Sequence, residues 1–344
     1  MGRRWVLVGA LAATLGGSIL VAPSAFASAN SPVRSTVATT LSPTMPIIRL
    51  HFNRAVAVSQ LPRLAVTPAL DTTWQAIGTY DVQAVVSGPL VPLGQYVIDA
   101  PTSMTCSASC SFAAAQPVTV NFSTNVNWEQ QLLATLHYLP LTFEPSTPPL
   151  SAAAPSEGTY RWSEPNWPAS LSGLWAQGNS TVLVTGALMA FQTNHSLPST
   201  GYADALTWSA LVNAAQQHQV DPNPYSYVSV STTRPESLTL YVGGHATFHT
   251  VVNTGISVSP TVTGTHPVYL RYTSQTMSGT NPNGTHYRDP GIPWVSYFYG
   301  GDALHGFIRS SYGFPQSLGC VEMPFASAKS VWPYTPIGTL VTVS

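Results

Sequence analysis

The sequence predicts a mainly β, multidomain protein, in which a small helical module separates two strand-rich blocks. Short runs of alternating apolar and polar residues, divided by Pro and Gly turns, occupy residues 45–122 and the chain from 225 to 344. Between them, over 125–220, apolar residues recur three and four positions apart, which is the helical period. The 30 prolines disfavour long helices.

The N-terminus has the pattern of a signal peptide over residues 1–27. Two arginines precede an apolar run, which ends in an Ala-x-Ala cleavage site at Ala27. A membrane anchor is the alternative, because about 20 apolar residues can span a bilayer. The glycines in the run and the break at Pro23 favour cleavage. We therefore expect a secreted, extracytoplasmic protein without stable membrane insertion, and a Ser/Pro/Thr-rich linker over 28–44.

The first strand-rich block, residues 45–122, is expected to be a β-sandwich-like spacer. The segment "MPIIRLHFNRAV" alternates apolar and polar side chains, and "YDVQAVV", "GQYVIDA" and "QPVTVNFS" follow as further strands. In an oxidising compartment Cys106 and Cys110 can form a disulfide, with two free thiols as the alternative. That pairing leaves Cys320 as the odd cysteine.

The middle block is predicted to contain helices at "NWEQQLLATLHYLPLTF", "VTGALMAFQTNH" and "DALTWSALVNAAQQ". In the second, apolar residues from Val184 to Phe191 fall at i, i+3, i+4 and i+7. The third repeats this spacing from Trp208, and either Asp204 or Thr207 can cap its start.

The third block, residues 225–344, is again rich in strands. The stretch "ESLTLYVGGHATFHTVVNTG" reads as a β-hairpin turning at Gly243 and Gly244, and "HPVYLRYTSQ" and "GTLVTVS" as further strands. Charged residues make up only 7% of the chain and the net charge is −1. A basic field that would hold nucleic acid or anionic lipid is therefore excluded.

Nucleophilic chemistry is indicated in "ALHGFIRSSYGFPQSLGCVEMP", where His305 precedes Cys320 by fifteen positions. An imidazole can take the proton of a thiol and later return it to a leaving amine. We expect the carbonyl of Gly306 to orient His305, and the backbone amides of Gly319 and Leu318 to bind an oxyanion. A buried structural cysteine is the alternative, because this spacing alone is a weak signal.

Four further residues are candidates for contacting a substrate. Arg309 and Ser317 border the expected site, although either can simply satisfy a turn. Trp294 and Tyr297 belong to the aromatic-rich run "YRDPGIPWVSYFYGG" and are expected to line a cleft, with core packing as the alternative.

Over about 225–344 the chain resembles the L,D-transpeptidase (YkuD-type) catalytic domain. The matching pieces occur in the order of the family: "SLTLYVGGHATFHTVVNTGI", "TVTGTHPVYLRY", "ALHGF", "SLGCVEM" and "IGTLVTVS". The resemblance implies that Cys320 is the nucleophile and His305 the proton donor and acceptor, with Ser317 and Gly319 inside the signature. It also implies cross-linking of peptidoglycan tetrapeptide stems to the amine of a neighbouring stem, without a metal or organic cofactor.

Two positions depart from the pattern of that family. Leu318 stands where the family has a second histidine, and Glu322 stands where it has Arg or Asn. A carboxylate beside Cys320 is expected to raise the pKa of the thiol and to change rate or specificity. An L,D-carboxypeptidase that trims stems and a catalytically weak peptidoglycan-binding protein are therefore the alternatives.

The middle block resembles a peptidoglycan-binding domain in the phrase "GALMAFQTNHSLPSTGYADALTWSAL". The resemblance implies that residues 125–220 hold the protein on the wall polymer, while a plain packing spacer is the alternative.

Overall fold

The computed structural model describes residues 35–42, 45–52, 55–61, 65–67, 72–86, 95–99, 118–121, 125–147 and 155–344. The predicted signal peptide and the predicted Cys106–Cys110 disulfide lie outside these residues. The chain divides into two compact units, the first ending at Phe122 and the second beginning at Ser123. In the described part of the chain, no helix is long and apolar enough to cross a membrane.

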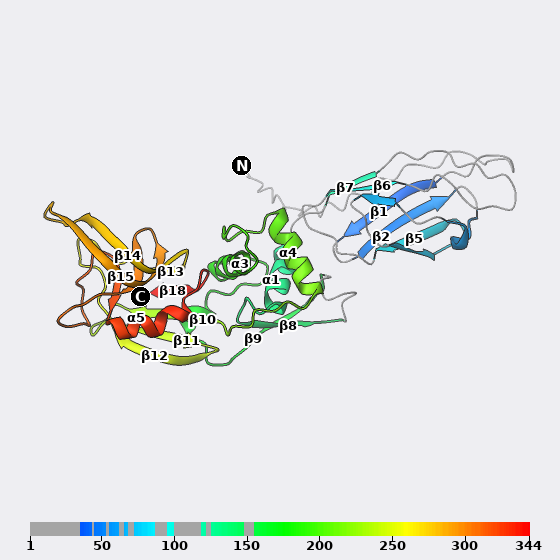
Figure 1. Cartoon of the computed structure of the whole chain (residues 1–344). Coiled ribbons are helices and arrows are strands. Elements are labelled where there is room, and N and C mark those ends of the chain that lie inside the picture. Colours follow the sequence, from blue (N-terminus) through cyan, green and yellow to red (C-terminus); the bar gives the residue numbers. More distant parts are fainter. Residues whose placement is uncertain are drawn as a thin grey trace, which may run out of the picture. The chain divides into compact units, whose positions relative to one another are not determined.

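The N-terminal unit contains two antiparallel sheets, as expected for a β-sandwich-like module (Figure 1). The first has the order β1-β2-β5-β4 and comprises β1 (Ser35–Ser42), β2 (Met45–Phe52), β5 (Asp81–Val86) and β4 (Thr72–Ala76). The second has the order β3-β6-β7 and comprises β3 (Ala65–Thr67), β6 (Gln95–Asp99) and β7 (Val118–Asn121). A short 3₁₀ helix, η1, spans Val58–Gln60.

Strand β2 has the alternation that its sequence predicts. Leu50 and Phe52 are fully buried, whereas His51 between them is exposed. Strand β1, however, lies inside the linker predicted over residues 28–44. Its register pairs Ser35 with Phe52 and Ser42 with Met45. A run rich in Thr, with Val and Leu, suits a pleated strand and pairs wherever a neighbouring edge is available, so composition alone misread it as a linker.

The helices of the C-terminal unit are α1 (Val126–Thr135), α2 (Ala169–Ser172), α3 (Val182–Asn194), α4 (Ala205–Gln216) and α5 (Phe325–Val331), with a 3₁₀ helix η2 at Trp332–Tyr334. The three predicted helices correspond to α1, α3 and α4. Asp204 caps α4, because its carboxylate accepts the backbone N–H of Thr207 at 2.8 Å. The apolar stripe of α4 is buried, and the Trp208 side chain is fully enclosed.

The C-terminal unit also contains three sheets. The first is the pair β8 (Leu141–Pro145) and β9 (Gly158–Trp162). The second has the order β12-β11-β10-β18-β13, with β12 (His245–Val251), β11 (Ser237–Val242), β10 (Ser226–Ser231), β18 (Leu340–Val343) and β13 (Gly264–Pro267). The third has the order β14-β15-β16-β17, with β14 (Leu270–Thr280), β15 (His286–Tyr299), β16 (Asp302–Gly306) and β17 (Val321–Met323).

The predicted hairpin is formed by β11 and β12. Gly243 and Gly244 make its turn with φ values of 54° and 77°, which glycine adopts without a steric cost. A second, longer hairpin of β14 and β15 extends beyond the rest of the unit (Figure 1).

The helices and the five-stranded sheet share one hydrophobic core. Tyr227 of β10 and Leu340 of β18 belong to the same buried cluster as the apolar faces of α1, α3 and α4. The contact is close at Gly186 of α3, where an added Cβ would lie 2.5 Å from the carbonyl oxygen of Gly338. The boundary predicted between 220 and 225 therefore falls inside one compact unit, because strand ends supply part of the apolar surface that covers the helices.

Glu129 of α1 is a buried carboxyl, 8% exposed, with no ion-pair partner among the described residues. Burial raises its pKa to about 7. In this pH range the folded state binds more protons than the unfolded state. We therefore expect the free energy of unfolding to fall by up to about 3 kcal/mol as pH rises from about 4.5 to 7.

Urea denaturation at several pH values measures this dependence. Glu129→Gln should flatten it, whereas Glu157→Gln, at an exposed position in the same unit, should preserve it. An unchanged slope in the Glu129 variant would contradict the assignment.

Candidate active site

A cavity of about 880 Å³ brings together most of the residues singled out in the sequence. His305, Arg309, Ser317, Leu318 and Cys320 all line it. Residues of the β14–β15 hairpin form much of the remaining wall, including Tyr297. Strand β16 carries His305, and the turn before β17 carries Cys320. Because β16 and β17 are adjacent parallel strands, these two side chains reach the same cavity.

His305 is positioned by its own strand. Its side chain is 2% exposed, and Nδ1 lies 3.0 Å from the carbonyl oxygen of Gly306, the contact predicted from the sequence. This acceptor requires the proton to sit on Nδ1, so Nε2 is the basic nitrogen. Nε2 has no partner among the described residues. Burial lowers the pKa of His305, with the Gly306 carbonyl opposing it, so the ring is neutral near pH 7.

Cys320 follows a glycine that no other residue can replace without strain. Gly319 has φ of 119°, and an added Cβ would lie 2.2 Å from Oδ1 of Asp302. The half-buried thiol of Cys320 donates to the carbonyl oxygen of Gly301 at 3.6 Å. Burial raises the pKa of Cys320 to about 12, while a hydrogen bond from the Ala303 backbone opposes this. The resting thiol is therefore protonated.

Ser317 holds the turn that presents the thiol. Its hydroxyl donates to the carbonyl oxygen of Cys320 and accepts the N–H of Gly319 at 3.2 Å. The amide of Gly319 is thus used inside the turn, which corrects its predicted oxyanion role. The N–H of Leu318 has no acceptor in the described part of the chain and remains available. Ser317 is only 3% exposed, so its hydroxyl positions the turn and is not offered to a substrate as predicted.

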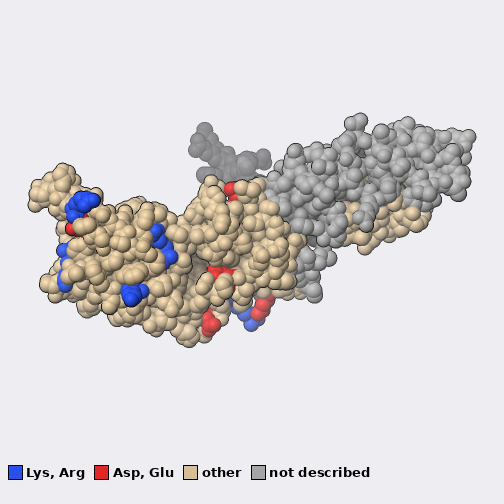
Figure 2. Space-filling model, in the orientation of Figure 1, with Lys and Arg blue, Asp and Glu red and all other residues tan. Residues whose placement is uncertain are grey.

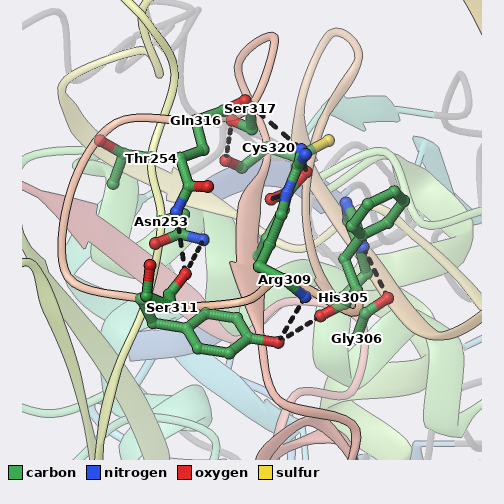
Figure 3. Close-up of polar contacts among 12 residues, drawn as sticks. Asn253, Thr254, His305, Gly306, Arg309, Ser311, Gln316, Ser317 and Cys320 are labelled. Atoms are coloured by element: carbon green, nitrogen blue, oxygen red, sulfur yellow. Dashed lines mark hydrogen bonds and ion pairs between the residues drawn. The ribbon is translucent and has the colours of Figure 1, made fainter.

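The segment that follows β12 forms hydrogen bonds with the turn that carries Cys320 (Figure 3). The carbonyl oxygen of Thr254 accepts the N–H groups of Gln316 and Ser317 at 2.9 and 3.0 Å. Asn253, fully buried, exchanges backbone hydrogen bonds with Glu322 at 2.9 Å, and its Oδ1 accepts the N–H of Gly313 at 3.1 Å. The loop carrying Cys320 is therefore built against a fixed backbone.

Arg309 and Glu322 form a two-pronged ion pair in the cavity wall. Nε and one terminal nitrogen of Arg309 donate to the two carboxylate oxygens of Glu322 at 2.7 and 2.8 Å. The guanidinium also lies 4.6 Å above the Phe307 ring and donates to the carbonyl oxygen of Gln316. Arg309 thus compensates the charge of Glu322 and, in this structure, does not extend into the cavity toward a substrate as predicted. Burial, not Glu322, is the main cause of the raised pKa of Cys320.

The two predicted aromatic residues have different positions. Tyr297 lines the cavity, but Trp294 does not. Trp294 has a positive φ of 60° and packs against the core cluster that includes residues of β10, β11, β17 and β18. Its ring lies 5.5 Å from that of Trp332. The unusual φ turns the indole to the core side of β15, which alternation along the strand does not reveal.

Several cavity residues were missed in the sequence. Gln275, Met277, Tyr287 and Asp289 come from the β14–β15 hairpin, and Asp302 begins β16. The hairpin residues lie far from the His and Cys in sequence and reach them only through strand pairing. Asp302 could have been noticed in the sequence as a charged residue that lies three positions before His305, just ahead of the apolar residues Ala303 and Leu304.

Together these features give a neutral thiol–imidazole pair with a prepared base. In such an arrangement an imidazole can take the proton of the thiol, and the sulfur can then attack a carbonyl carbon as a thiolate. The free N–H of Leu318 is a donor that can stabilise the resulting oxyanion.

The raised pKa of Cys320 predicts slow alkylation of the resting protein. Because the thiolate is the nucleophile, the rate of reaction with iodoacetamide should rise about tenfold per pH unit from pH 7 to at least pH 9. Peptide mass spectrometry of the fragment that contains Cys320 measures this rate separately from the other cysteines. A plateau below pH 8 would instead indicate a preformed thiolate–imidazolium pair.

Residues 225–343 match the family model of the L,D-transpeptidase catalytic domain. The solved catalytic domain of an L,D-transpeptidase from E. faecium is 24% identical, covering 36% of this chain and 100% of that one, with a TM-score of 0.32. An L,D-transpeptidase from Mycobacterium smegmatis is 10% identical over 91% of this chain and 100% of its own, with a TM-score of 0.32.

L,D-transpeptidase 3 from Mycobacterium tuberculosis, solved with a faropenem-derived adduct, is 10% identical over 88% of this chain and 92% of its own, again with a TM-score of 0.32. These TM-scores add nothing to the family match. No curated protein matches the chain.

Proposed function

We propose, from the premise that residues 225–343 are an L,D-transpeptidase catalytic domain, that the chain is a secreted cell-wall enzyme that cross-links peptidoglycan stem peptides. The carrying observation is that Cys320 and His305 line one cavity, with Nδ1 of the imidazole fixed and Nε2 free. The family match supports the reaction class, and this geometry supports the assignment of Cys320 and His305 to it.

The first half of the reaction forms an acyl-enzyme. The sulfur of Cys320 attacks the carbonyl carbon of the L-residue that precedes the terminal D-alanine of a tetrapeptide stem, and Nε2 of His305 takes the thiol proton. The N–H of Leu318 stabilises the oxyanion. The carbon–nitrogen bond then breaks, and Nε2 protonates the departing amine. A thioester on Cys320 remains.

The second half transfers the acyl group to an amine of a neighbouring stem. The amine nitrogen attacks the thioester carbon, Nε2 takes its proton, the carbon–sulfur bond breaks and the sulfur leaves. Water in place of the amine gives an L,D-carboxypeptidase, so the two activities differ only in the second substrate.

Product analysis tests this proposal with the full-length chain. Incubation with a disaccharide-tetrapeptide should release D-alanine and give a cross-linked dimer detectable by mass spectrometry. A shortened tripeptide without dimer would indicate trimming. Unchanged substrate with a folded protein would indicate a binding protein instead.

We further propose that the helical part of the C-terminal unit binds the wall polymer. Supporting this role, two large apolar side chains are exposed to solvent: Tyr202, in the turn between α3 and α4, is 64% exposed, and Leu206, in the first turn of α4, is 66% exposed. Deleting this region would remove part of the shared core, so substitution is the better test. Tyr202→Ser with Leu206→Ser should reduce sedimentation with insoluble peptidoglycan but leave turnover of soluble stems. Equal sedimentation would contradict this role.

A further inference from the structure

Asp302 is a carboxylate placed against the nucleophilic turn. It is the first residue of β16 and lines the same cavity as Cys320. Its Oδ2 accepts the N–H of Val262 at 2.9 Å, which fixes the carboxylate plane. The other oxygen, Oδ1, lies against Gly319, because an added Cβ there would come within 2.2 Å of it. The glycine thus allows the carboxylate to approach the turn closely.

Asp302 has no ion-pair partner among the described residues. Burial raises its pKa, although the nearby imidazole of His266 acts to lower it. The cavity's one arginine, Arg309, is held by Glu322. Asp289 is a second cavity carboxylate without an ion-pair partner in the described part of the chain. The cavity therefore has an excess of negative charge next to the sulfur.

A second observation is that a free basic nitrogen lies in the same cavity as this carboxylate, which indicates a ligand that can give up a proton. His305, three residues further along the same strand, is 2% exposed, and its Nε2 faces no described partner. The carboxylate of Asp302 and the free Nε2 of His305 lie on one strand and line the same cavity as the sulfur, so together they can bind an ammonium ion and accept a proton from its nitrogen. The carboxylate attracts the cation, and the imidazole accepts the proton that the nitrogen gives up as it attacks the thioester.

We propose that Asp302 selects the acyl acceptor in the second half of the reaction, favouring a cationic amine and disfavouring an amine with an adjacent carboxylate. This inference rests on the proposed function. The acceptor enters as an ammonium beside Asp302 and loses one proton to solvent. The neutral nitrogen then attacks the thioester carbon, a C–N bond forms and the C–S bond breaks. The second nitrogen proton passes through Nε2 of His305 to the departing sulfur, which becomes the thiol again.

The same carboxylate separates transfer from hydrolysis. Water carries no charge and gains nothing from Asp302, whereas a cationic amine is concentrated beside the thioester. Asp302 therefore favours transfer over hydrolysis when the acyl-enzyme partitions between the two reactions.

Two matched acceptors test the proposal: D-alaninamide, a cation, and isotopically labelled D-alanine, which differs in carrying a carboxylate and whose label distinguishes its transfer product from the donor. Full-length wild type and Asp302→Asn are each incubated with a disaccharide-tetrapeptide donor, and both transfer products are quantified by mass spectrometry. The asparagine can still accept the N–H of Val262, so the turn keeps its support. We expect the product ratio of D-alaninamide to D-alanine to fall about tenfold in the variant. Intrinsic amine reactivity cancels in this comparison.

The controls separate this inference from the proposed function. Formation of an imipenem adduct should be no slower in Asp302→Asn than in wild type, because removing this charge lowers the pKa of Cys320. Glu144→Gln, at a surface ion pair with Arg161, should leave the acceptor ratio unchanged. An unchanged ratio in Asp302→Asn, with adduct formation intact, would overturn the inference and leave the proposed function standing. Absence of any adduct in wild type would overturn both.

A measurement on wild type alone guards against a variant that fails to fold. Raising the ionic strength should lower transfer to D-alaninamide relative to hydrolysis, because salt screens the attraction of a partly exposed carboxylate. A partition that is insensitive to salt would contradict the assignment to Asp302.

Discussion

Cys320→Ala is expected to abolish formation of a covalent acyl-enzyme and to lower turnover of stem peptides by about 10⁴-fold or more. The sulfur lines the same cavity as His305, whose Nδ1 is held by the Gly306 carbonyl oxygen. Without it, the imidazole has no group to activate except water. Intact-protein mass spectrometry after incubation with imipenem measures the adduct, because a carbapenem carbonyl presents a strained electrophile to the same sulfur.

The fold of this variant should be unchanged, because the thiol donates a single long hydrogen bond to Gly301. Near-wild-type thermal stability is therefore the matched check. His305→Gln provides the complementary variant, since it retains the sulfur but removes the base, and should form the adduct much more slowly. An adduct of undiminished yield in Cys320→Ala would place the nucleophile elsewhere and end the proposed mechanism.

Arg309→Met is expected to destabilise the C-terminal unit by about 3 kcal/mol. The carboxylate of Glu322 is 5% exposed and receives two hydrogen bonds from Arg309, so the substitution leaves a buried charge without its cation. The effect lies at the lower end of the range for buried pairs, since the Arg309 side chain is 30% exposed and water can enter in its place. Urea denaturation measures the loss.

A second substitution distinguishes this cause from lost packing on Phe307. If the uncompensated charge is responsible, adding Glu322→Met to Arg309→Met should recover most of the lost stability. Equal instability of the single and double variants would instead assign the loss to the guanidinium–ring contact. Uncompensated Glu322 should also slow imipenem acylation in the single variant, because a nearby negative charge further disfavours the thiolate.

Features set by local chemistry could be predicted from the sequence. The Gly243–Gly244 turn requires positive φ at both positions, and adjacent glycines announce it. The start of α4 depends on one carboxylate, Asp204, and one backbone N–H. His305 and Cys320 were identified with the help of a family resemblance, and their meeting follows from β16 and β17 being neighbours.

Features set by distant contacts could not be predicted. The pairing of Arg309 with Glu322 depends on how the loop between β16 and β17 folds back, and the twelve intervening residues carry no period that reveals it. The amide of Gly319 was expected to face a substrate, but the hydroxyl of Ser317 takes it. The core that α3 and β18 share could not be predicted, because in the sequence each apolar surface can be assigned to a separate domain.

The core shared by the helices and the sheet has a mechanical consequence for the proposed action on insoluble peptidoglycan. Gly186 and Gly338 meet backbone to backbone, so no flexible tether lies between the helices and the strands that carry the chemistry. If the helices bind a glycan strand as proposed, Cys320 reaches only stems at a fixed distance from the bound segment. The protein would then have to dissociate and bind again to move along the wall, and the spacing of successive cross-links would reflect its own dimensions.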